Sequence, residues 1–335
     1  MHGWIIVDKP LGLGSTQVVS AVKRALRQGG YGKFKVGHGG TLDPLASGVL
    51  PVAVGEATKL AGRMLDSDKV YDFTIRFGEQ TDTLDAEGVV IATSDVRPTL
   101  AQVEAVLPRF TGAITQVPPA YSALKVDGER AYDLARAGED VVLASRDVTV
   151  HSLQVLPGFG SGRGTAPEGR GGGAGAAGAD APPLHHSLRE RSPSPSELGE
   201  DLGEITLIAH VSKGTYIRSL ARDIALALGT VGHVTMLRRT KAGPFTLSQA
   251  ITLDNLGEAA MARTLEHLLL PLRAGLDDIP ALPLSPDQAG ALRQGRVLTG
   301  IAKDDGPYFA CDGDTPVALV SVEAHEARVV RGFNL

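Results

Sequence analysis

The chain has 335 residues, of which 43% are hydrophobic, and its formal net charge at pH 7 is −5. This length allows one large domain or two of ordinary size, and the apolar content excludes a chain that is disordered throughout. The single cysteine, Cys311, excludes a disulfide framework and a cysteine-based zinc cluster, so a reducing, cytoplasmic setting is expected. The apolar runs are too short for a signal peptide or a membrane span, and we expect no membrane association.

A short strand and a helix are predicted first along the chain. Residues 4–8 are mostly apolar and end at the turn Lys9-Pro10-Leu11-Gly12. Ser15 has the side chain of an N-cap, and the helix that follows it is predicted to end at Gly29-Gly30. The apolar positions of this helix recur at helical spacing: Val18, Val19, Val22 and Leu26.

The turn Gly12-Leu13-Gly14-Ser15-Thr16 is similar to the start of a phosphate-binding loop, which makes a nucleotide-dependent enzyme one alternative. Gln17, however, stands where the third glycine of a dinucleotide fingerprint would be. The chain also has no Gly-Lys-Ser or Gly-Lys-Thr sequence. A simple connection between a strand and a helix is therefore favoured.

Three further elements have clear patterns. Residues 69–77 alternate between apolar and polar side chains, which predicts a half-buried strand. Its apolar face carries Tyr71, Phe73, Ile75 and Phe77. Thr99 and Gln102 fit a capping box, which begins a predicted helix that ends by Pro108. Apolar residues at helical spacing predict another helix over residues 215–228.

Residues 157–203 are rich in Gly, Pro, Ala and Ser, and this composition predicts a disordered insertion. Strand-like segments flank it at residues 147–156 and 204–211, so the insertion is expected to lie in a loop that joins two strands of one sheet. Beyond residue 275, prolines precede a short helix around residues 288–294 and several apolar, β-rich runs. This region is predicted to be a small, separate, mainly β unit.

The densest chemical signal extends from Gly37 to Leu50. Four glycines within 12 residues indicate unusual backbone dihedrals or a close approach to a ligand. Pro44 biases the backbone of the preceding Asp43 toward the extended region. A carboxylate on a loop restrained in this way is a candidate nucleophile or general base, and the alternative is an Asp-Pro turn without a chemical role.

Metal binding is not predicted from the sequence. His38 lies close to Asp43, but the nine histidines are scattered and no pair has the spacing of one helix face. No second cluster of acidic residues and histidines accompanies this pair along the chain.

A second dense signal extends from Ser212 to Asp223. Tyr216 and Arg218 stand at the start of a predicted helix, where their polar ends can face a cleft. A guanidinium beside Asp43 would aim the carboxylate through a charge-assisted hydrogen bond. Taken alone, however, this segment has the pattern of an ordinary amphipathic helix.

Two stretches are strongly basic. Residues 18–40 hold five Lys or Arg residues and no acid, and residues 211–241 hold six against Asp223 alone. Because affinity for phosphates depends on local charge, the net charge of −5 does not exclude nucleic acid. The stretches are either solvated helix faces or an RNA-binding surface.

Together these segments resemble the bacterial tRNA pseudouridine-55 synthases of the TruB family, over nearly all of residues 3–250 outside the insertion. Each motif alone is weak, whereas their order and spacing are specific. The matching motifs are Ile5-Ile6-Val7-Asp8-Lys9-Pro10, the Gly37–Leu50 block, Gly55-Glu56-Ala57-Thr58-Lys59, Thr81-Asp82-Thr83-Leu84-Asp85, Val117-Pro118-Pro119, Ser122-Ala123-Leu124-Lys125-Val126-Asp127-Gly128, Lys213–Arg222 and Leu237-Arg238-Arg239-Thr240.

The resemblance implies roles for individual residues. Asp43 is at the position of the catalytic aspartate, and Arg218 is at that of an arginine which pairs with this carboxylate. Tyr71 would stack on the target base, and His38 would help to hold the everted RNA. Further substrate-binding roles are implied for Tyr216 in the active site, Leu237 in the base pocket and Lys59 near the site.

The resemblance also implies an α+β fold with a mixed, mainly antiparallel central sheet and flanking helices. Residues 1–275 would form the catalytic domain and residues 276–335 a small, β-rich, PUA-like RNA-binding domain. The implied reaction is the isomerisation of uridine 55 in the T arm of tRNA to pseudouridine, by base flipping, in a monomer. No cofactor is expected, because the reaction leaves the composition of the RNA unchanged.

With the resemblance in place, the basic stretches are better interpreted as surfaces that bind the shape and phosphates of a tRNA arm. One alternative from another class stays open. The chain could be a non-catalytic tRNA-binding or RNA-folding protein on the same scaffold.

Overall fold

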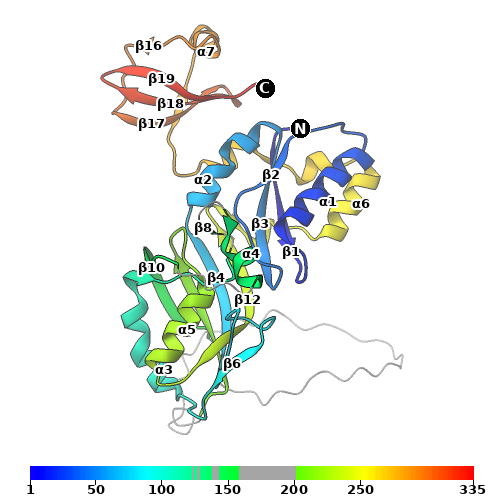
Figure 1. Ribbon diagram of the computed structural model, residues 1–335. Coiled ribbons are helices and arrows are strands. Elements are labelled where there is room, and N and C mark those ends of the chain that lie inside the picture. The colour runs from blue at the N-terminus through cyan, green and yellow to red at the C-terminus, as the bar shows by residue number, and fades with distance from the viewer. Residues whose placement is uncertain (123, 127–128, 138–142, 158–200) are drawn as a thin grey trace, which may run out of the picture.

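A computed structural model describes residues 1–122, 124–126, 129–137, 143–157 and 201–335 (Figure 1). Helices pack on a large mixed sheet, and a smaller sheet contains the C-terminal residues. This is the predicted α+β architecture. Among the helices of the described ranges, none is long and apolar enough to cross a membrane.

Ten strands of the described residues form the large sheet. Along its main path they are β14 (Leu270–Pro271), β1 (Gly3–Lys9), β3 (Ala46–Val54), β12 (Gly232–Ala242), β4 (Lys69–Phe77), β11 (Glu204–Val211), β10 (Arg146–Val155) and β7 (Gly112–Gln116). β2 (Val36–His38) pairs with β3, and β13 (Phe245–Thr246) pairs with β12. The pairing of β3 with β12 is parallel, whereas the other described pairings of this sheet are antiparallel. The sheet is therefore mixed and mainly antiparallel, as predicted.

The remaining elements are helices and small sheets. The α-helices are α1 (Ser15–Gln28), α2 (Ala61–Asp66), α3 (Leu100–Val106), α4 (Ala131–Arg136), α5 (Ile217–Ala227), α6 (Leu253–Ala262) and α7 (Pro286–Arg293). The short 3₁₀ helices are η1 (Gly55–Leu60), η2 (Leu107–Phe110), η3 (Leu247–Gln249), η4 (Leu265–Leu268) and η5 (Leu272–Gly275). Two hairpins pair β5 (Glu79–Thr81) with β6 (Val90–Thr93) and β8 (Lys125–Val126) with β9 (Glu129–Arg130).

The start of α1 differs from its prediction. The N-cap is Gly14, and Ser15 is the first helical residue, so the prediction that Ser15 caps the helix was wrong. The Ser15 hydroxyl is engaged elsewhere, because it accepts a hydrogen bond from the Leu42 N–H and donates one to the Leu42 carbonyl. The Gln17 side chain instead accepts from the Gly14 N–H at 2.6 Å. The turn is thus closed by contacts within the protein, which disfavours the nucleotide-binding alternative.

Several predicted patterns are confirmed in the sheet. Phe73, Ile75 and Phe77 of β4 are buried, as their alternation required. The capping box of Thr99 and Gln102 begins α3. The strands that flank the predicted insertion, β10 and β11, pair antiparallel as neighbours in one sheet. Residues 158–200 of that insertion lie outside the described residues.

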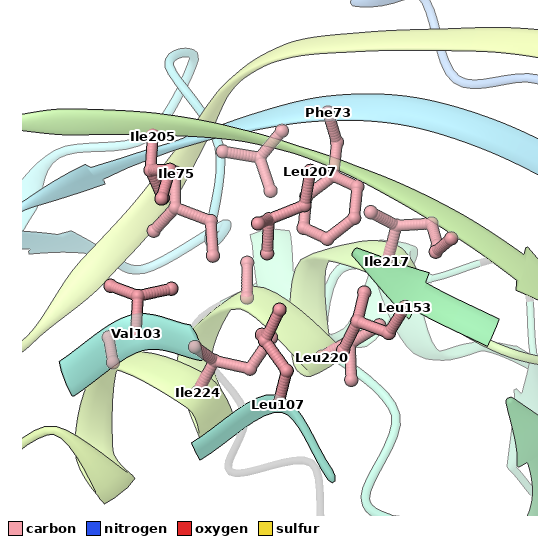
Figure 2. Packing of buried hydrophobic residues seen from close by; sticks show 14 of the residues in the cluster. Phe73, Ile75, Val103, Leu107, Leu153, Ile205, Leu207, Ile217, Leu220 and Ile224 are labelled. Atoms are coloured by element: carbon pink, nitrogen blue, oxygen red, sulfur yellow. The ribbon is translucent and has the colours of Figure 1, made fainter. Parts of the chain in front are cut away.

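The hydrophobic core is divided between the two ends of the sheet. Figure 2 shows Phe73, Ile75 and Leu207 of the sheet facing Leu220 and Ile224 of α5. Burial of side chains of this size contributes roughly 1.5–3 kcal/mol each, so the apolar face of α5 holds that helix on the sheet. At the other end, α1 and α6 lie side by side over β1 and β3 (Figure 1).

The C-terminal residues form a second sheet of five strands. In spatial order these are β15 (Ala281–Pro283), β17 (Gly306–Asp312), β18 (Thr315–Glu323), β19 (Glu326–Gly332) and β16 (Leu298–Thr299). Helix α7 packs on this sheet through Ala289 and Leu292. Phe309 and Phe333 pack in one cluster with Trp4 and Leu272, so the C-terminal unit shares a core with the large sheet.

Candidate active site

A pocket of about 340 Å³ lies where the loop before β3, strands β4 and β12, and the start of α5 meet. Its lining includes five of the residues that the sequence predicted for the site. They are Asp43, Tyr71, Tyr216, Arg218 and Leu237. The volume falls within the usual range of ligand pockets.

The parallel pairing of β12 with β3 brings two of these elements together. Leu237 of β12 is in register with Ala46, three residues after Asp43. Gly48, at a φ of +101°, allows the two strands to approach, since a Cβ there would lie 2.2 Å from the Arg239 carbonyl oxygen. The fold thus places the base of the Asp43 loop against a strand that comes nearly 200 residues later in the chain.

The Asp43 loop is fastened at several backbone atoms. Ser15 of α1 bonds both the N–H and the carbonyl of Leu42. The guanidinium of Arg239, which is 1% exposed, donates to the carbonyls of Gly40 and Thr41. Lys9 donates to the Pro44 carbonyl at 3.3 Å. Side chains from α1, β1 and β12 therefore hold the backbone on both sides of Asp43.

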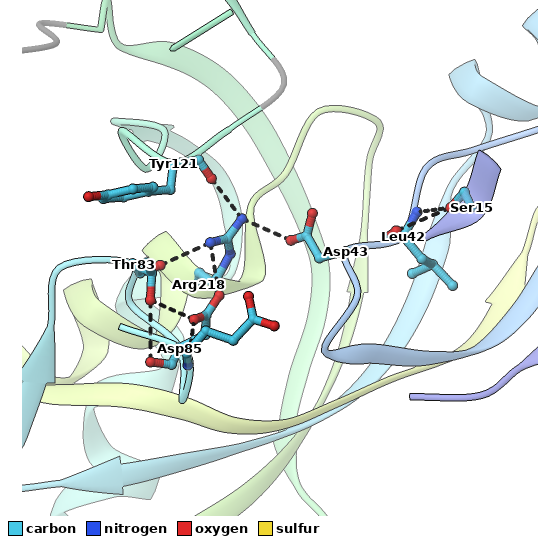
Figure 3. Close-up of polar contacts among 8 residues, drawn as sticks. Ser15, Leu42, Asp43, Thr83, Asp85, Tyr121 and Arg218 are labelled. Atoms are coloured by element: carbon cyan, nitrogen blue, oxygen red, sulfur yellow. Dashed lines mark hydrogen bonds and ion pairs between the residues drawn. The ribbon is translucent and has the colours of Figure 1, made fainter. Parts of the chain in front are cut away.

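Arg218 makes the central polar contacts of the pocket (Figure 3). Its Nη2 lies 2.8 Å from Oδ2 of Asp43, which confirms the predicted pairing. Its Nη1 lies 3.0 Å from Oδ2 of Asp85, and the two nitrogens also donate to the Thr83 and Tyr121 carbonyls. The Arg218 side chain is 8% exposed, against 47% for Asp43. The guanidinium is thus a buried group, bonded through both Nη atoms, that orients a half-exposed carboxylate in the pocket.

Asp85 is the main residue of this network that we did not predict. Its side chain is 10% exposed, and its Oδ1 accepts hydrogen bonds from the Thr83 hydroxyl and the Glu87 N–H. The sequence does contain it in a family motif, Thr81–Asp85, but nothing in the local pattern indicates that this turn faces α5. Because Asp85 is paired on one oxygen and hydrogen-bonded on the other, it fixes the guanidinium from below the pocket.

Tyr71 of β4 and Leu237 of β12 belong both to the hydrophobic core and to the pocket. Tyr71 and Leu237 each pack against the hydrophobic clusters at both ends of the large sheet. Both also line the pocket. The core and substrate-binding interpretations of Tyr71 are therefore compatible, because the apolar face of β4 continues into the pocket.

The start of α5 is held by a glutamine from β7. The Gln116 side chain accepts a hydrogen bond from the Tyr216 N–H at 2.8 Å and donates to the Tyr216 carbonyl at 3.0 Å. Gln116 is 1% exposed. This pairing sets the direction in which Tyr216 and the first turn of α5 enter the pocket.

Comparison with known proteins identifies the family. Residues 23–160 match the family model described as "TruB family pseudouridylate synthase (N terminal domain)", and residues 218–277 match "tRNA pseudouridylate synthase B C-terminal domain". The chain is 60% identical to the "tRNA pseudouridine synthase B" of Novosphingobium aromaticivorans, over 100% of this chain and 98% of that protein. The corresponding protein of Zymomonas mobilis is 55% identical, over 100% and 96%.

The chain belongs to the TruB family of pseudouridylate synthases. It is accordingly a pseudouridine synthase, an isomerase that modifies RNA. A solved structure titled "Crystal Structure of a Cbf5-Nop10-Gar1 Complex" shares the fold, with a TM-score of 0.64 and 24% identity over 99% of this chain and 84% of that one.

Two residues that the resemblance placed at the TruB site lie elsewhere in the described structure. Lys59 pairs with Glu56 and donates to the Gly332 carbonyl, so it joins η1 to the C-terminal unit instead of lining the pocket. His38 lies half-buried at the end of β2, also outside the pocket lining. Burial and, next, the charge of Arg239 lower the pKa of His38 below 6.5. The substrate-binding roles of both residues stay predictions.

The TruB pocket also contains a buried lysine that sequence reasoning missed. Lys69 lines the pocket, and its amine donates to the carbonyls of Met64, Leu65 and Ser67 at the end of α2. Burial, and next the charge of Arg239, lower its pKa to about 8. Its alternating position on β4 predicts a buried face, but only the fold shows that helix α2 ends above it.

The two basic stretches have different surroundings in the TruB fold. In the first stretch all five cations are exposed. In the second, Arg218 and Arg239 are buried, Lys213 pairs with Asp66, and Arg238 pairs with Asp8. The prediction that the second stretch is a phosphate-binding surface is therefore wrong for the buried Arg218 and Arg239, and it stays a prediction for the other cations of the stretch.

Proposed function

We propose that this TruB-family enzyme converts uridine 55 in the T arm of tRNA to pseudouridine, with Asp43 as the catalytic carboxylate. The name that its full-length relatives carry supports tRNA as the substrate. The observation that carries the proposal for Asp43 is its position: a half-exposed carboxylate in the pocket, 2.8 Å from the buried guanidinium of Arg218.

The reaction needs an ionised carboxylate at one stage. The bond between N1 of the uracil and C1′ of the ribose breaks, the base turns, and C5 bonds to C1′. The proton lost from C5 is balanced by the one gained at N1. A carboxylate can serve as the nucleophile that forms a covalent intermediate or as the base that removes a proton from the sugar.

The two oxygens of Asp43 are suited to different tasks. Oδ2 accepts the hydrogen bond from Arg218, which orients the group. Oδ1 accepts no hydrogen bond from the described part of the chain. We therefore assign Oδ1 to the reacting nucleotide.

The target base must leave its stack before it can enter the pocket, at a cost of a few kcal/mol. Tyr71 and Leu237 offer an aromatic and an apolar surface beside Asp43 in the same pocket. Stacking of a base on an aromatic side chain contributes about 1–3 kcal/mol, which offsets much of that cost. We propose that Tyr71 receives the flipped uracil, while Tyr216 closes the pocket from the start of α5.

The rest of the tRNA arm must be held outside the pocket. We propose that the exposed cations of residues 18–40 contact its phosphates, and that the PUA-like unit, residues 276–335, binds RNA beside the catalytic domain of residues 1–275. We further propose a cytoplasmic enzyme that acts as a monomer. Light scattering of the purified protein, with and without RNA, would test the oligomeric state.

The proposal is tested by incubating the enzyme with a T-arm stem-loop and with full-length tRNA, and mapping pseudouridine by chemical modification and primer extension. We expect product at position 55. Asp43→Asn should lower the rate at least about 10³-fold, because the substitution removes the ionisable oxygen while RNA binding persists. Asp95→Asn, at an exposed position, is the matched control and should react normally.

Each part of the proposal has its own contrary result. RNA binding by the wild-type protein without product would favour the non-catalytic alternative. Full activity of Asp43→Asn would reject the residue assignment but leave the reaction standing. Product at other uridines and none at position 55 would reject the site specificity.

A further inference from the structure

A cluster of potential metal ligands lies on the large sheet, outside the active-site pocket. The ligand atoms of Asp68, His151 and His210 all lie within 4.8 Å of one another. Oδ2 of Asp68 is 3.1 Å from Nε2 of His151 and 3.9 Å from Nε2 of His210. The two imidazole rings are 4.7 Å apart between centroids. Two imidazole nitrogens and one carboxylate oxygen therefore point to one small volume.

His151 and His210 come from the neighbouring strands β10 and β11, and Asp68 directly precedes the next strand, β4. His210 is in register with Val70 of β4, and Asp68 is two residues before Val70, so both belong to the same face of the sheet. This face is opposite the core cluster that contains Ala209 and Val211. Asp68 also follows directly on helix α2, whose C-cap is Ser67. Asp68 is therefore held between the end of α2 and the start of β4, beside His210.

His151 lies on the same face, at an irregularity in β10. Val150 pairs with Val211 and Ser152 pairs with His210, so the register shifts at His151. In a regular strand, residues 151 and 152 would face opposite sides of the sheet. The β-bulge instead leaves both His151 and Ser152 exposed on the His210 side, while Val150 and Leu153 stay buried. Because Val150 is opposite Val211, His151 follows on the outer face beside His210.

The geometry is close to that of a tetrahedral metal site. Bonds of about 2.0–2.1 Å from Zn²⁺ to nitrogen and oxygen place the ligand atoms of a tetrahedron about 3.3 Å apart. The present separations reach 4.8 Å, and the three side chains are 38–48% exposed. Small rotations of exposed side chains are therefore sufficient to close the site.

The surroundings favour a cation. A hollow beside the cluster is lined by the acids Asp66, Asp68, Asp277 and Asp278 and by the cations Arg63 and Lys241. Lys213 also pairs with Asp66. Acids therefore outnumber cations in the lining of the hollow. Its polar groups also offer positions for water molecules that would complete the coordination of a metal ion.

We propose that Asp68, His151 and His210 form a binding site for a divalent transition metal ion of the Zn²⁺ class. The ion would link β10 and β11 to the start of β4, on the sheet face opposite Lys69 and Val211, which line the active-site pocket. The sequence predicted no metal site since the three ligands are far apart along the chain and converge only through the pairing of β11 with β10 and β4. The proposal concerns binding and stability, and it does not rest on the proposed catalytic role of Asp43.

The simpler alternative is a surface ion pair between Asp68 and a protonated histidine. An ion pair needs only one histidine, whereas here both Nε2 atoms are directed at the same carboxylate oxygen. The two explanations differ in their response to Zn²⁺. A simple ion pair would not bind Zn²⁺, whereas the proposed metal site would.

The test uses full-length protein without a polyhistidine tag, freed of metal by a chelator and titrated with ZnCl₂ in a calorimeter. We expect one Zn²⁺ ion per chain. His151→Ala, His210→Ala and Asp68→Asn should each weaken the affinity at least about tenfold, since even the loss of an outer partner of a ligand has this effect. His267→Ala, at an exposed histidine outside the cluster, is the control and should bind as the wild type does.

Two further measurements separate the site from non-specific binding. Co²⁺ should give visible absorption bands of low-symmetry coordination in the wild type and not in His210→Ala. Saturating Zn²⁺ should raise the melting temperature of the wild type more than that of Asp68→Asn, a variant of nearly unchanged size. Absence of Zn²⁺ binding to the wild type, or binding that all three cluster variants leave unchanged, would overturn the proposal.

Discussion

Nη2 of Arg218 lies 2.8 Å from Oδ2 of Asp43, while Nη1 of the same guanidinium lies 3.0 Å from Oδ2 of Asp85. The arginine is thus shared between a half-exposed carboxylate in the pocket and a nearly buried one beneath it. A planar guanidinium can meet both acids at once, and a lysine ammonium cannot reproduce this geometry. The ion pairs therefore connect the stability of the protein to the orientation of its proposed catalytic group.

Replacement of Arg218 should affect both properties. We expect Arg218→Ala to lower the free energy of unfolding by about 3 kcal/mol, because it leaves Asp85 buried without its cation. Pseudouridine formation should fall steeply, and Arg218→Lys should restore only part of the activity. Urea denaturation and single-turnover kinetics would measure the two effects. Arg222→Ala, on the same helix and paired with its neighbour Asp223, is the control. A stable Arg218→Ala variant with normal turnover would contradict this account.

Tyr71 should act through its ring more than through its hydroxyl. We expect Tyr71→Phe to keep most of the activity, and Tyr71→Leu to lower kcat/KM for the stem-loop roughly tenfold or more, the equivalent of 1–3 kcal/mol of base stacking. Both variants keep an apolar side chain against the two core clusters. Equal kcat/KM values for the Leu and Phe variants would show that the ring does not receive the base.

Ser15 should support the Asp43 loop from helix α1. Ser15→Ala removes both hydrogen bonds to Leu42 and leaves buried backbone groups without a partner, at an expected cost of about 1–3 kcal/mol in unfolding free energy. We expect kcat to fall while KM for RNA changes little, because the loop is displaced and the phosphate contacts are not. Ser20→Ala removes an exposed hydroxyl from the same helix and should have no effect. A change in KM alone would assign Ser15 to RNA binding.

His38 should make the protein less stable in acid. Its pKa in the folded protein is lowered below 6.5 by burial and by Arg239. The unfolded chain therefore takes up a proton on His38 at a higher pH than the folded protein does, and the unfolding free energy falls as the pH drops below about 6.5. We expect His38→Gln to gain stability relative to the wild type between pH 7 and pH 5 in urea titrations. A constant difference between His38→Gln and the wild type across this range would refute the prediction.

Local patterns predicted the elements of the fold better than the contacts of the site. The alternation in residues 69–77 predicted β4, and the strand-like flanks of the insertion predicted the β10–β11 pair. These features are local because they depend on the two-residue period of a strand. The pairing of Asp43 with Arg218 was expected only from the family resemblance, since the two residues are far apart in the chain.

The parts that could not be predicted depend on long-range packing. Asp85 is acidic and near a turn, and nothing in its own segment indicates that it lies under Arg218. The cations near Arg238 were interpreted as an RNA surface because their acidic partners, such as Asp8, are distant in sequence. His151 lies beside His210 because of the register of the β10–β11 pair, which no local pattern indicates.

The position of β12 between β3 and β4 has a consequence for the synthesis of the protein. β3 and β4 follow each other closely in the chain, and both pair with β12 in the folded sheet. Neither pairing can form until β12 has been synthesised. A nascent chain on the ribosome therefore leaves the edges of β3 and β4 that face β12 unpaired through the synthesis of β10, the long insertion and β11. It also lacks Arg218 and Leu237 during that time. The enzyme cannot act on RNA before some 240 residues have emerged, and these edges are where premature association with other chains would begin.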